Sequence, residues 1–341
     1  MIEVDGNYLE GGGQIIRTAI ALSVITKKSV HIFNIRKGRK TPGLRPQHLE
    51  AIAGVAKICG AAVEGLKIQS LDITFCPDQV HGGSFTIDTR TAGSVTLVMQ
   101  TLLPIAAFGE FPFRFVVKGG TAVPFSPSII YFQEVFCQFL RLMNVAVSVH
   151  INKHGFYPAG GGEIEVSIMP AQLTNIDITE HGNLDKIEVF SIASHHLKDT
   201  RVAERMTKGF KEIIPNANFK TSYVRSQSPG CFVTAIAFYD SGCRIGASAL
   251  GEIRKRAEDV GRDAARHLKH VQESGSVIDH WMVDQIIVYM ALATVRSSSL
   301  SRVSIPILTK HAETNIWVVE KFLPVKFKIQ DDIMNCCTRA G

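Results

Sequence analysis

Residues 154–162 read HGFYPAGGG and are the most unusual stretch of the chain. Three consecutive glycines weaken the order of a backbone, because each costs about 0.5–1 kcal/mol relative to alanine. Two interpretations follow. The block forms a tight hairpin after a strand that ends near Asn152, or another group approaches its backbone so closely that no side chain fits.

The same order of secondary-structure elements is expected three times along the chain. It consists of a polar or glycine-rich loop, an apolar helix, a β-branched strand, a second loop, a second helix and further strands. The first helices are expected at 14–25, 91–108 and 280–293, the strands at 29–35, 113–118 and 301–307, and the second helices from 46 to before Gly60, at 127–142 and at 313–322. Pro46 suits a first helical position and Gly60 a C-cap. The sequence therefore predicts an α+β fold built on three repeated units.

The third copy is interrupted by about a hundred residues. Residues 181–276 read as a strand, a charged helix at 199–213, three strands and a basic helix at 252–271. We expect a large domain over 1–180 and 277–341, with a smaller α+β domain inserted at 181–276. The basic run IRKRAEDVGRDAARHLKH either contacts nucleic acid or is the solvated face of an amphipathic helix.

Composition narrows the class of protein. The 341 residues carry a net charge of +6, which suits a polyanionic partner without requiring one. No apolar run reaches the ~18 residues of a membrane span, and the start lacks a signal-peptide pattern, so we expect a cytoplasmic protein with no membrane partner. The seven cysteines, among them the adjacent Cys336 and Cys337, lack zinc or disulfide spacing and receive no role. A homo-oligomer is left open.

Two loops in the first repeat favour phosphate binding. In LEGGGQIIR, residues 9–17, glycines open a helix and expose unpaired N–H groups, while Arg17 follows one turn later. Glu10 in this loop would hold a metal ion or pair with Arg17. In NIRKGRKTPGLRPQHLE, residues 34–50, five basic side chains lie on a loop stiffened by two prolines. The alternatives are a structural glycine turn and a solvated basic loop.

One histidine stands apart from the other eleven. His311 lies in LTKHAETNIWVVEKFLP, residues 308–324, where a loop passes into a helix that Thr309 or Thr314 could cap. If the repeats are real, this loop, the two loops above and the loop at 121–127 lie at corresponding ends of three similar sheets. Loops on a rigid scaffold are where chemistry usually takes place.

Several of these blocks together resemble the RNA 3′-terminal phosphate cyclases. The matching stretches cover nearly the whole chain in the family's order: DGNYLEGGGQIIRTAIALS, IRKGRKTPGLRPQHL, TAGSVTLVMQTLLP, HGFYPAGGG, the Asp284-Gln285 pair and HAETNIWVVEKFLP. The resemblance implies three units of two helices and a four-stranded sheet, with a smaller inserted domain. It also implies that an RNA 3′-phosphate becomes a 2′,3′-cyclic phosphate, with ATP and a divalent metal, Mg²⁺ or Mn²⁺, as cofactors.

The resemblance also assigns residues. His311 would be the nucleophile that takes AMP from ATP and passes it to the RNA 3′-phosphate, giving an RNA-(3′)pp(5′)A end. Glu10 would bind the metal, and the terminal phosphate would meet Gln14, Arg17, Arg36, Arg39, Gln47 and His48. ATP would be contacted by Gln100, Pro127, Tyr131, Trp281, Met282, Val283, Asp284 and Gln285. For Tyr131 and Trp281, core packing is an equal alternative.

Two rival functions remain at this stage. One branch of the family lacks the histidine and serves in ribosomal RNA processing without catalysis. The enolpyruvyl transferases share the core architecture and would act on a small phosphorylated sugar acid. The intact HAETN context of His311 favours the catalytic branch.

Overall fold

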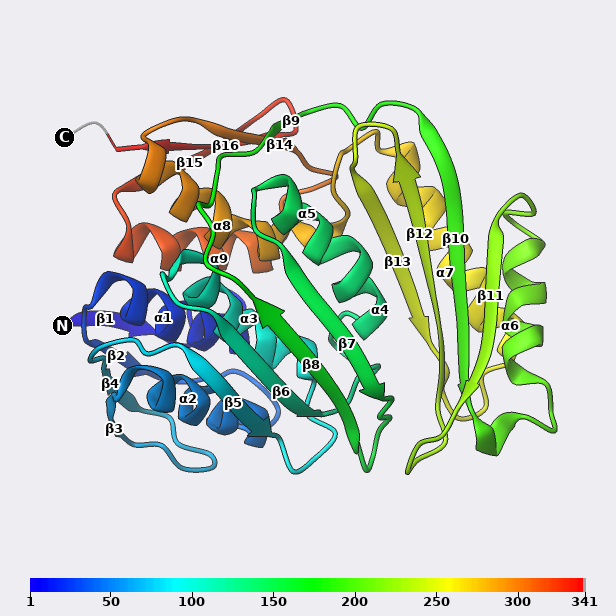
Figure 1. Ribbon diagram of the computed structural model, residues 1–341, viewed down its shortest axis with the longest axis horizontal. Helices are drawn as coiled ribbons and strands as arrows, with labels where there is room; N and C mark the ends of the chain where they lie inside the picture. Colours follow the sequence, from blue (N-terminus) through cyan, green and yellow to red (C-terminus); the bar gives the residue numbers. More distant parts are fainter. Residues whose placement is uncertain (340–341) are drawn as a thin grey trace.

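Four small four-stranded sheets and the helices packed on them form the computed structural model, which describes residues 1–339 (Figure 1). Three of the sheets belong to repeated units. In each repeated unit the first two strands are parallel and joined across a helix, and the last two complete the sheet in antiparallel pairing. A parallel pair needs such a crossover connection, and the helix covers one face of the sheet.

The first unit contains β1 (Ile2–Asp5), α1 (Gly13–Thr26), β2 (Val30–Phe33), α2 (Pro46–Cys59), β3 (Ala62–Glu64) and β4 (Ile73–Cys76), with sheet order β1-β2-β4-β3. The second contains β5 (Gly83–Asp88), α3 (Val95–Phe108), β6 (Phe113–Gly119), α4 (Ile129–Tyr131), η1 (Phe132–Phe136), α5 (Cys137–Leu142), β7 (Val147–Lys153) and β8 (Gly162–Ile168). Its order, β5-β6-β8-β7, is the same arrangement.

The third unit is split by the fourth sheet. It contains β9 (Asp177–Ile178), then α8 (His280–Ser297), β14 (Ser301–Ser304), α9 (Lys310–Phe322), β15 (Val325–Gln330) and β16 (Ile333–Thr338), in the order β15-β16-β14-β9. Read from β9, this is the order of the other two units. The predicted α+β fold with three repeated units is confirmed.

The fourth sheet lies between β9 and α8 in sequence and at the right of Figure 1. It is built from β10 (Leu184–Ser194), β11 (Asn218–Val224), β12 (Cys231–Tyr239) and β13 (Arg244–Leu250), with η2 (His195–Leu197), α6 (Val202–Lys211) and α7 (Ala257–Glu273). The domain boundaries at 180/181 and 276/277 stay a prediction.

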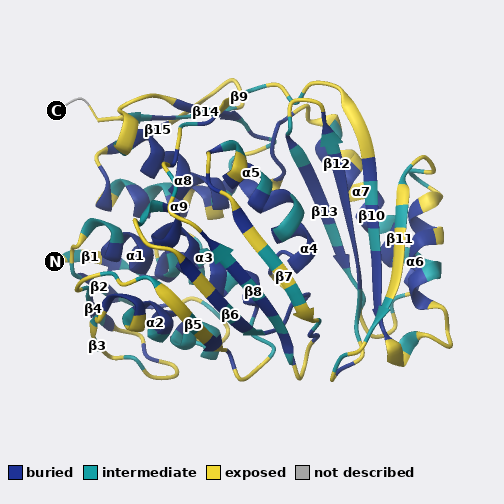
Figure 2. Ribbon diagram, in the orientation of Figure 1, coloured by how far each residue is buried: buried dark blue, intermediate teal, exposed yellow. Residues whose placement is uncertain are grey.

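The centre of the repeated units is helical. Most residues of α1, α3 and α8 are buried, polar ones such as Thr18, Ser23 and Thr294 included (Figure 2). Helix α1 packs against α2, α3 and α9, so it touches all three units. A helix that is buried on all sides needs apolar residues all round, which explains its composition. This central position makes the N-terminus of α1 a meeting point for loops of different units.

Local chemistry explains the helix ends that were predicted well and those that were not. Helix α2 begins at Pro46 and ends before Gly60, which is left-handed as expected of a C-cap. The predicted basic helix at 252–271 begins five residues later, at Ala257, because Arg254 is also left-handed at φ +70° and interrupts any helix there. The predicted helix at 127–142 holds a π-helical stretch at its middle.

The basic run on α7 is an amphipathic helix face. Its Arg262 pairs with Glu212 of the α6 side at 2.7 Å, and Arg266 pairs with Asp263 at 3.3 Å. The opposite face, which includes Val260, Ala264 and Leu268, is buried. Because its basic side chains are matched by carboxylates, the solvated-face interpretation is favoured over nucleic-acid binding.

Both interpretations of the glycine block hold. Strands β7 and β8 pair antiparallel, so residues 154–161 form the hairpin connection. A Cβ on Gly155 would lie 2.3 Å from the backbone nitrogen of Gly162 and 2.5 Å from the backbone oxygen of Gly119, far inside contact distance. The hairpin therefore also requires a close approach between backbones.

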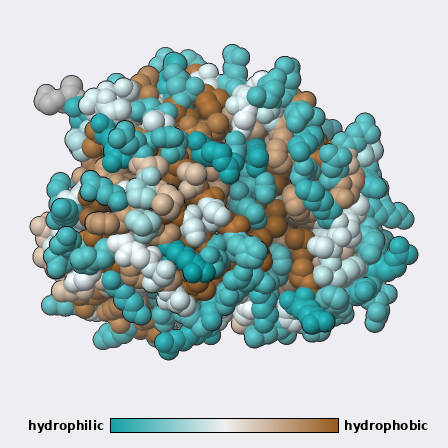
Figure 3. All heavy atoms as spheres, viewed as in Figure 1, coloured by the Kyte–Doolittle hydropathy of each residue, from teal (hydrophilic) through white to brown (hydrophobic). Residues whose placement is uncertain are grey.

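None of the helices within residues 1–339 is long and apolar enough to cross a bilayer. Figure 3 shows hydrophilic residues over much of one face, with apolar ones between them in several places, among them the region beside the fourth sheet. All seven cysteines are unpaired. The cytoplasmic location stays a prediction.

Candidate active site

A cleft of about 1010 Å³ opens where the loops of different repeats meet. The glycine loop before α1, the basic loop before α2, the loop at 123–125, the start of α9 and the hairpin at 157–158 all line it. The expected convergence of loops is therefore found. The cleft brings together eight of the predicted residues: Glu10, Gln14, Arg17, Arg36, Arg39, Gln47, His48 and His311.

The cleft is strongly basic. Arg17, Arg36, Arg39, Lys40 and Arg45 line it, against a single carboxylate, Glu10. Arg36 is held in place because its Nη1 donates to the backbone oxygens of Thr41 at 2.9 Å and Gly43 at 2.8 Å. Burial, and then the neighbouring Arg45 and Arg39, lower the pKa of Arg36. Such an assembly of cations suits a ligand with several phosphate charges.

His311 is fixed by a glutamine from another repeat. It is the second residue of α9, whose N-cap Thr309 accepts a hydrogen bond from the backbone nitrogen of Ala312 at 3.0 Å. The side-chain amide of Gln14 donates to the backbone oxygen of His311 at 2.6 Å, and its Oε1 contacts the ring Nδ1. Because this oxygen only accepts, Nδ1 carries the ring proton. The lone pair of the neutral ring is therefore on Nε2.

Glu10 lies against the other side of the ring. Its Oε1 is 3.1 Å from Nε2 of His311 and 3.0 Å from Nη2 of Arg39. The expectation that Glu10 pairs with Arg17 is wrong, because Arg39 takes that place. Burial is the main cause that lowers the pKa of His311, with Arg17 and Arg39 adding to it and Glu10 opposing it. Burial thus favours the neutral ring, whereas Glu10, whose oxygen also only accepts, favours a proton on Nε2.

His48 is a buried neutral donor beside this group. Burial, with Arg17, Arg36 and Arg45, lowers its pKa to about 3. Its Nδ1 accepts from the backbone nitrogen of Arg45 at 3.2 Å, which leaves the proton on Nε2. A Cβ on Gly13 would lie 2.4 Å from that Nε2, so the glycine makes room for the ring. His48 thus presents an N–H group at the start of α1.

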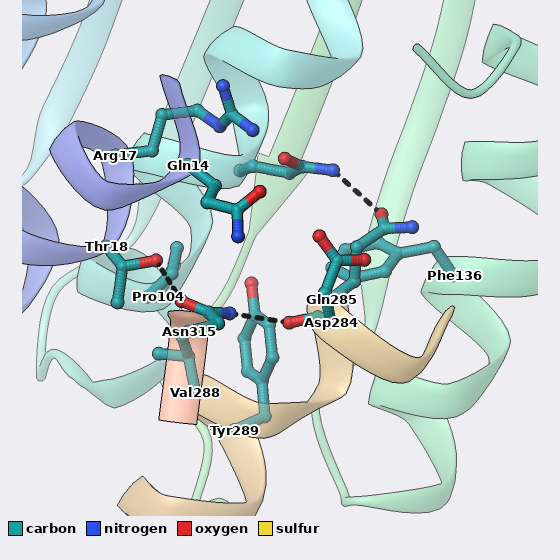
Figure 4. A pocket seen from close by; sticks show the side chains of 11 residues that line it. Gln14, Arg17, Thr18, Pro104, Phe136, Asp284, Gln285, Val288, Tyr289 and Asn315 are labelled. Carbon is teal, nitrogen blue, oxygen red and sulfur yellow. Dashed lines mark hydrogen bonds between the residues drawn. The ribbon is translucent and has the colours of Figure 1, made fainter. Parts of the chain in front are cut away.

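Next to the cleft lies a small chamber of about 30 Å³, lined by both polar and apolar side chains (Figure 4). Gln14 and Arg17 of α1 line both cavities, and they face Asp284, Gln285 and Tyr289 of α8 across the chamber. Two hydrogen bonds join residues that line the chamber. The Gln100 amide donates to Oε1 of Gln285 at 3.0 Å, and the Asn315 amide donates to the backbone oxygen of Asp284 at 2.6 Å. The hydroxyl of Tyr289 is buried and has no hydrogen-bond partner among residues 1–339.

Charge inside this chamber is costly. Burial raises the pKa of Asp284 to about 7, although Arg17 opposes the shift. The same burial lowers the pKa of Arg17 to about 10. Two opposite charges share a desolvated space here without a direct ion pair, so the protonation of Asp284 changes near neutral pH.

We expect Asp284→Asn to stabilise the protein more at pH 8 than at pH 5. Between the unfolded pKa of 3.8 and the folded pKa of about 7, the folded state binds the extra proton, so the contribution of Asp284 to stability falls as pH rises through 7. The gain in Tm over the wild type should be greater by about 5 °C at pH 8. Exposed Asp185→Asn is the control. Equal gains at both pH values would contradict the raised pKa.

Five of the residues assigned to ATP line neither cavity. Met282 and Val283 are fully buried in the core, Pro127 is buried, and Trp281 is half-buried beside His280. Tyr131 is buried, and its hydroxyl donates to the Asp279 carboxylate at 2.6 Å. Their roles stay a prediction. The remaining three, Gln100, Asp284 and Gln285, lie together in the inner chamber.

Sequence reasoning missed two residues that line the cleft and a buried one, outside both cavities, that caps α8. Asp279 caps α8 through the backbone nitrogens of Trp281 and Met282, and it also accepts from Gly246 of β13 at 2.9 Å. Phe125 and Tyr157 line the cleft as well. The Tyr157-Pro158 pair beside the three glycines was a visible signal, whereas nothing local marked Asp279 or Phe125.

The side chains of the site suit a divalent cation only when a bound phosphate ligand supplies further contacts to it. No cluster of three His, Cys, Asp or Glu side chains within residues 1–339 could hold a metal ion alone. Glu10 offers one carboxylate beside a phosphate-binding loop. Mg²⁺ is commonly held in this way, by one or two carboxylates together with substrate phosphates. The residues present therefore fit a cation that arrives with a polyphosphate.

Comparisons with known proteins identify the family. A family model described as RNA 3′-terminal phosphate cyclase matches residues 8–329. Proteins named RNA 3′-terminal phosphate cyclase from Pyrobaculum neutrophilum and Korarchaeum cryptofilum are 41% and 40% identical to this chain, covering 96% and 97% of it and 95% of each relative. One of the same name from Caldivirga maquilingensis is 42% identical over 95% of this chain and 93% of its own. The chain belongs to the RNA 3′-terminal phosphate cyclase family.

Proposed function

We propose that this protein uses ATP to convert the 3′-terminal phosphate of an RNA into a 2′,3′-cyclic phosphate, with His311 as the nucleophile that carries AMP. The observation that carries the proposal is the place of His311. Its ring is fixed by Gln14 at the point where the glycine loop and the basic loop meet. An activated nucleophile needs such an orienting partner.

In the first step, Nε2 of His311 bonds to the α-phosphorus of ATP, and the bond from that phosphorus to pyrophosphate breaks. Because Nδ1 keeps its proton toward Gln14, the ring can accept the new bond at Nε2 without losing a proton first. Glu10 must release Nε2 before this attack, since it lies 3.1 Å from that atom. Glu10 would then hold the divalent cation, which would supply neutralising charge at the phosphates.

In the second step, an oxygen of the RNA 3′-phosphate attacks the phosphorus of AMP, and the phosphorus–nitrogen bond breaks. The neutral imidazole leaves. In the third step, the neighbouring 2′-hydroxyl attacks the 3′-phosphorus, its proton passes to solvent, and AMP departs. This closure is intramolecular, so proximity supplies much of the rate. Arg36, Arg39 and Arg45 would neutralise the charge on the phosphoryl oxygens.

The test uses an RNA with a labelled 3′-phosphate. We expect ATP to make the label resistant to phosphatase, with one AMP and one pyrophosphate released for each end closed. A non-catalytic RNA-processing relative would release neither product. An enolpyruvyl transferase would act without ATP, and ATP would not raise its Tm. Label that stays phosphatase-sensitive with ATP and metal present would contradict the proposal.

Gln14→Ala should slow self-adenylation about tenfold to a hundredfold, because the ring of His311 then loses the group that fixes its orientation and tautomer. The KM for ATP should change little, since Gln14 acts through His311. Gln138→Ala is the matched control, because its amide bonds the backbone oxygen of Gly242 away from the cleft. An effect on KM alone would show that Gln14 binds phosphate instead.

A further inference from the structure

Two aromatic side chains at the cleft are largely exposed to solvent. Phe125 is 94% exposed and Tyr157 is 69% exposed, and both line the cleft that contains His311. They come from different parts of the second unit, the loop after β6 and the β7–β8 hairpin. Both rings are therefore accessible to a ligand that enters the cleft.

The two rings stand on loops that are fastened together. The backbone nitrogen of Thr121 donates to the backbone oxygen of Gly155 at 2.9 Å, and the nitrogen of Gly155 donates to the Thr121 hydroxyl at 3.1 Å. Phe125 itself has φ +63°, a left-handed conformation that is unfavourable for a bulky residue. No packing offsets this strain, because the ring is almost fully in solvent. Strain of this kind gathers at ligand-binding sites.

The surroundings of the rings indicate which ligand they fit. Polar and charged residues such as Lys40, Thr41 and Thr91 line the same cleft as the rings and their apolar neighbours Val123, Pro124 and Pro158. The cleft combines exposed aromatic faces with five cationic side chains. This combination is typical of sites for single-stranded nucleic acid, where bases stack on aromatic rings and basic groups follow the phosphates.

We propose that Phe125 and Tyr157 stack on the bases of the last unpaired nucleotides of the RNA, while its terminal phosphate reaches the Arg36 and Arg39 loop. The proposal rests on the proposed function, because it assumes that RNA is the substrate. It narrows the substrate class to single-stranded 3′ ends, since bases inside a duplex cannot stack on protein rings. The sequence of the RNA is of little consequence, because every base has a face to stack.

The test measures binding of a fluorescent eight-nucleotide RNA with a 3′-phosphate, by anisotropy and without ATP. Phe125→Gly combined with Tyr157→Ala should weaken binding about tenfold or more, since both rings proposed to stack on bases are removed. Glycine relieves the strain at φ +63°, so Phe125→Gly alone should lower affinity without lowering Tm. Phe111→Ala, another partly exposed phenylalanine at the far end of α3, should bind like the wild type.

Removing bases from the RNA separates stacking from other effects. On an RNA whose last two nucleotides are abasic, the wild type should bind as weakly as the double variant, and the double variant should lose little more. Equal affinity of wild type and double variant for the intact RNA would overturn the proposal. The proposal would also be overturned if the double substitution lowered affinity for the intact RNA and for the abasic RNA by the same factor. A wild type that binds no 3′-phosphorylated RNA contradicts the proposed function itself, and that result appears before any variant is made.

Discussion

His311→Ala should abolish labelling of the protein with AMP, lowering it at least a thousandfold, when the protein is incubated with ATP labelled at the α-phosphate and a divalent metal. The variant removes the atom proposed to bond phosphorus, and His48, the other histidine that lines the cleft, cannot replace it. Nε2 of His311 faces the cleft, whereas His48 is buried and its Nε2 carries the proton. Retained AMP should be labile in acid and stable in base, as expected of a phosphorus–nitrogen bond.

The matched control is His196→Ala. His196 is exposed on η2 of the inserted unit, and labelling should be that of the wild type. ATP should still raise the Tm of the His311 variant, because the cationic loops are intact. Labelling that survives in the His311 variant would assign the nucleophile to another residue.

Arg39→Ala should impair transfer of AMP to RNA about a hundredfold while slowing self-adenylation less than tenfold. Its guanidinium lies in the basic loop proposed for the RNA phosphate. It also donates to Glu10 at 3.0 Å, which accounts for the smaller effect on the first step. The two rates are measured separately, self-adenylation without RNA and transfer from the isolated protein–AMP adduct.

Lys37→Ala provides the control for charge. Lys37 lies on the same loop and is exposed, but it does not line the cleft. Both rates should stay near those of the wild type. If Arg39→Ala slows both steps equally, Arg39 serves the nucleotide or Glu10 rather than the RNA phosphate.

The sequence was sufficient to predict the repeats because their signals are local. A proline at a helix start and a glycine at its end placed α2 within one residue. Apolar residues on all sides of α1, α3 and α8 identified helices at the centre of the protein. The start of α7 was missed because charged residues such as Glu252 suit a helix, and only the left-handed backbone of Arg254 prevents one.

The convergence of the loops at one site was predictable, because it follows from the repeats. The finer contacts of the site were not, because they join distant parts of the chain. Gln14 and His311 are 297 residues apart, and Tyr131 and Asp279 are 148 apart. No local pattern shows that Gln14 contacts a ring or that Tyr131 turns its hydroxyl into the core. The exposure of Phe125 likewise depends on how its loop is fastened to the hairpin.

The central claim is that the imidazole of His311 carries AMP. The most direct measurement is mass spectrometry of peptides from the protein after incubation with ATP and metal, under basic conditions that preserve a phosphorus–nitrogen bond. We predict that one AMP is attached to the peptide containing His311, and that adding 3′-phosphorylated RNA removes it. An adduct on any other residue, or a fully active protein that never carries AMP, would contradict the account.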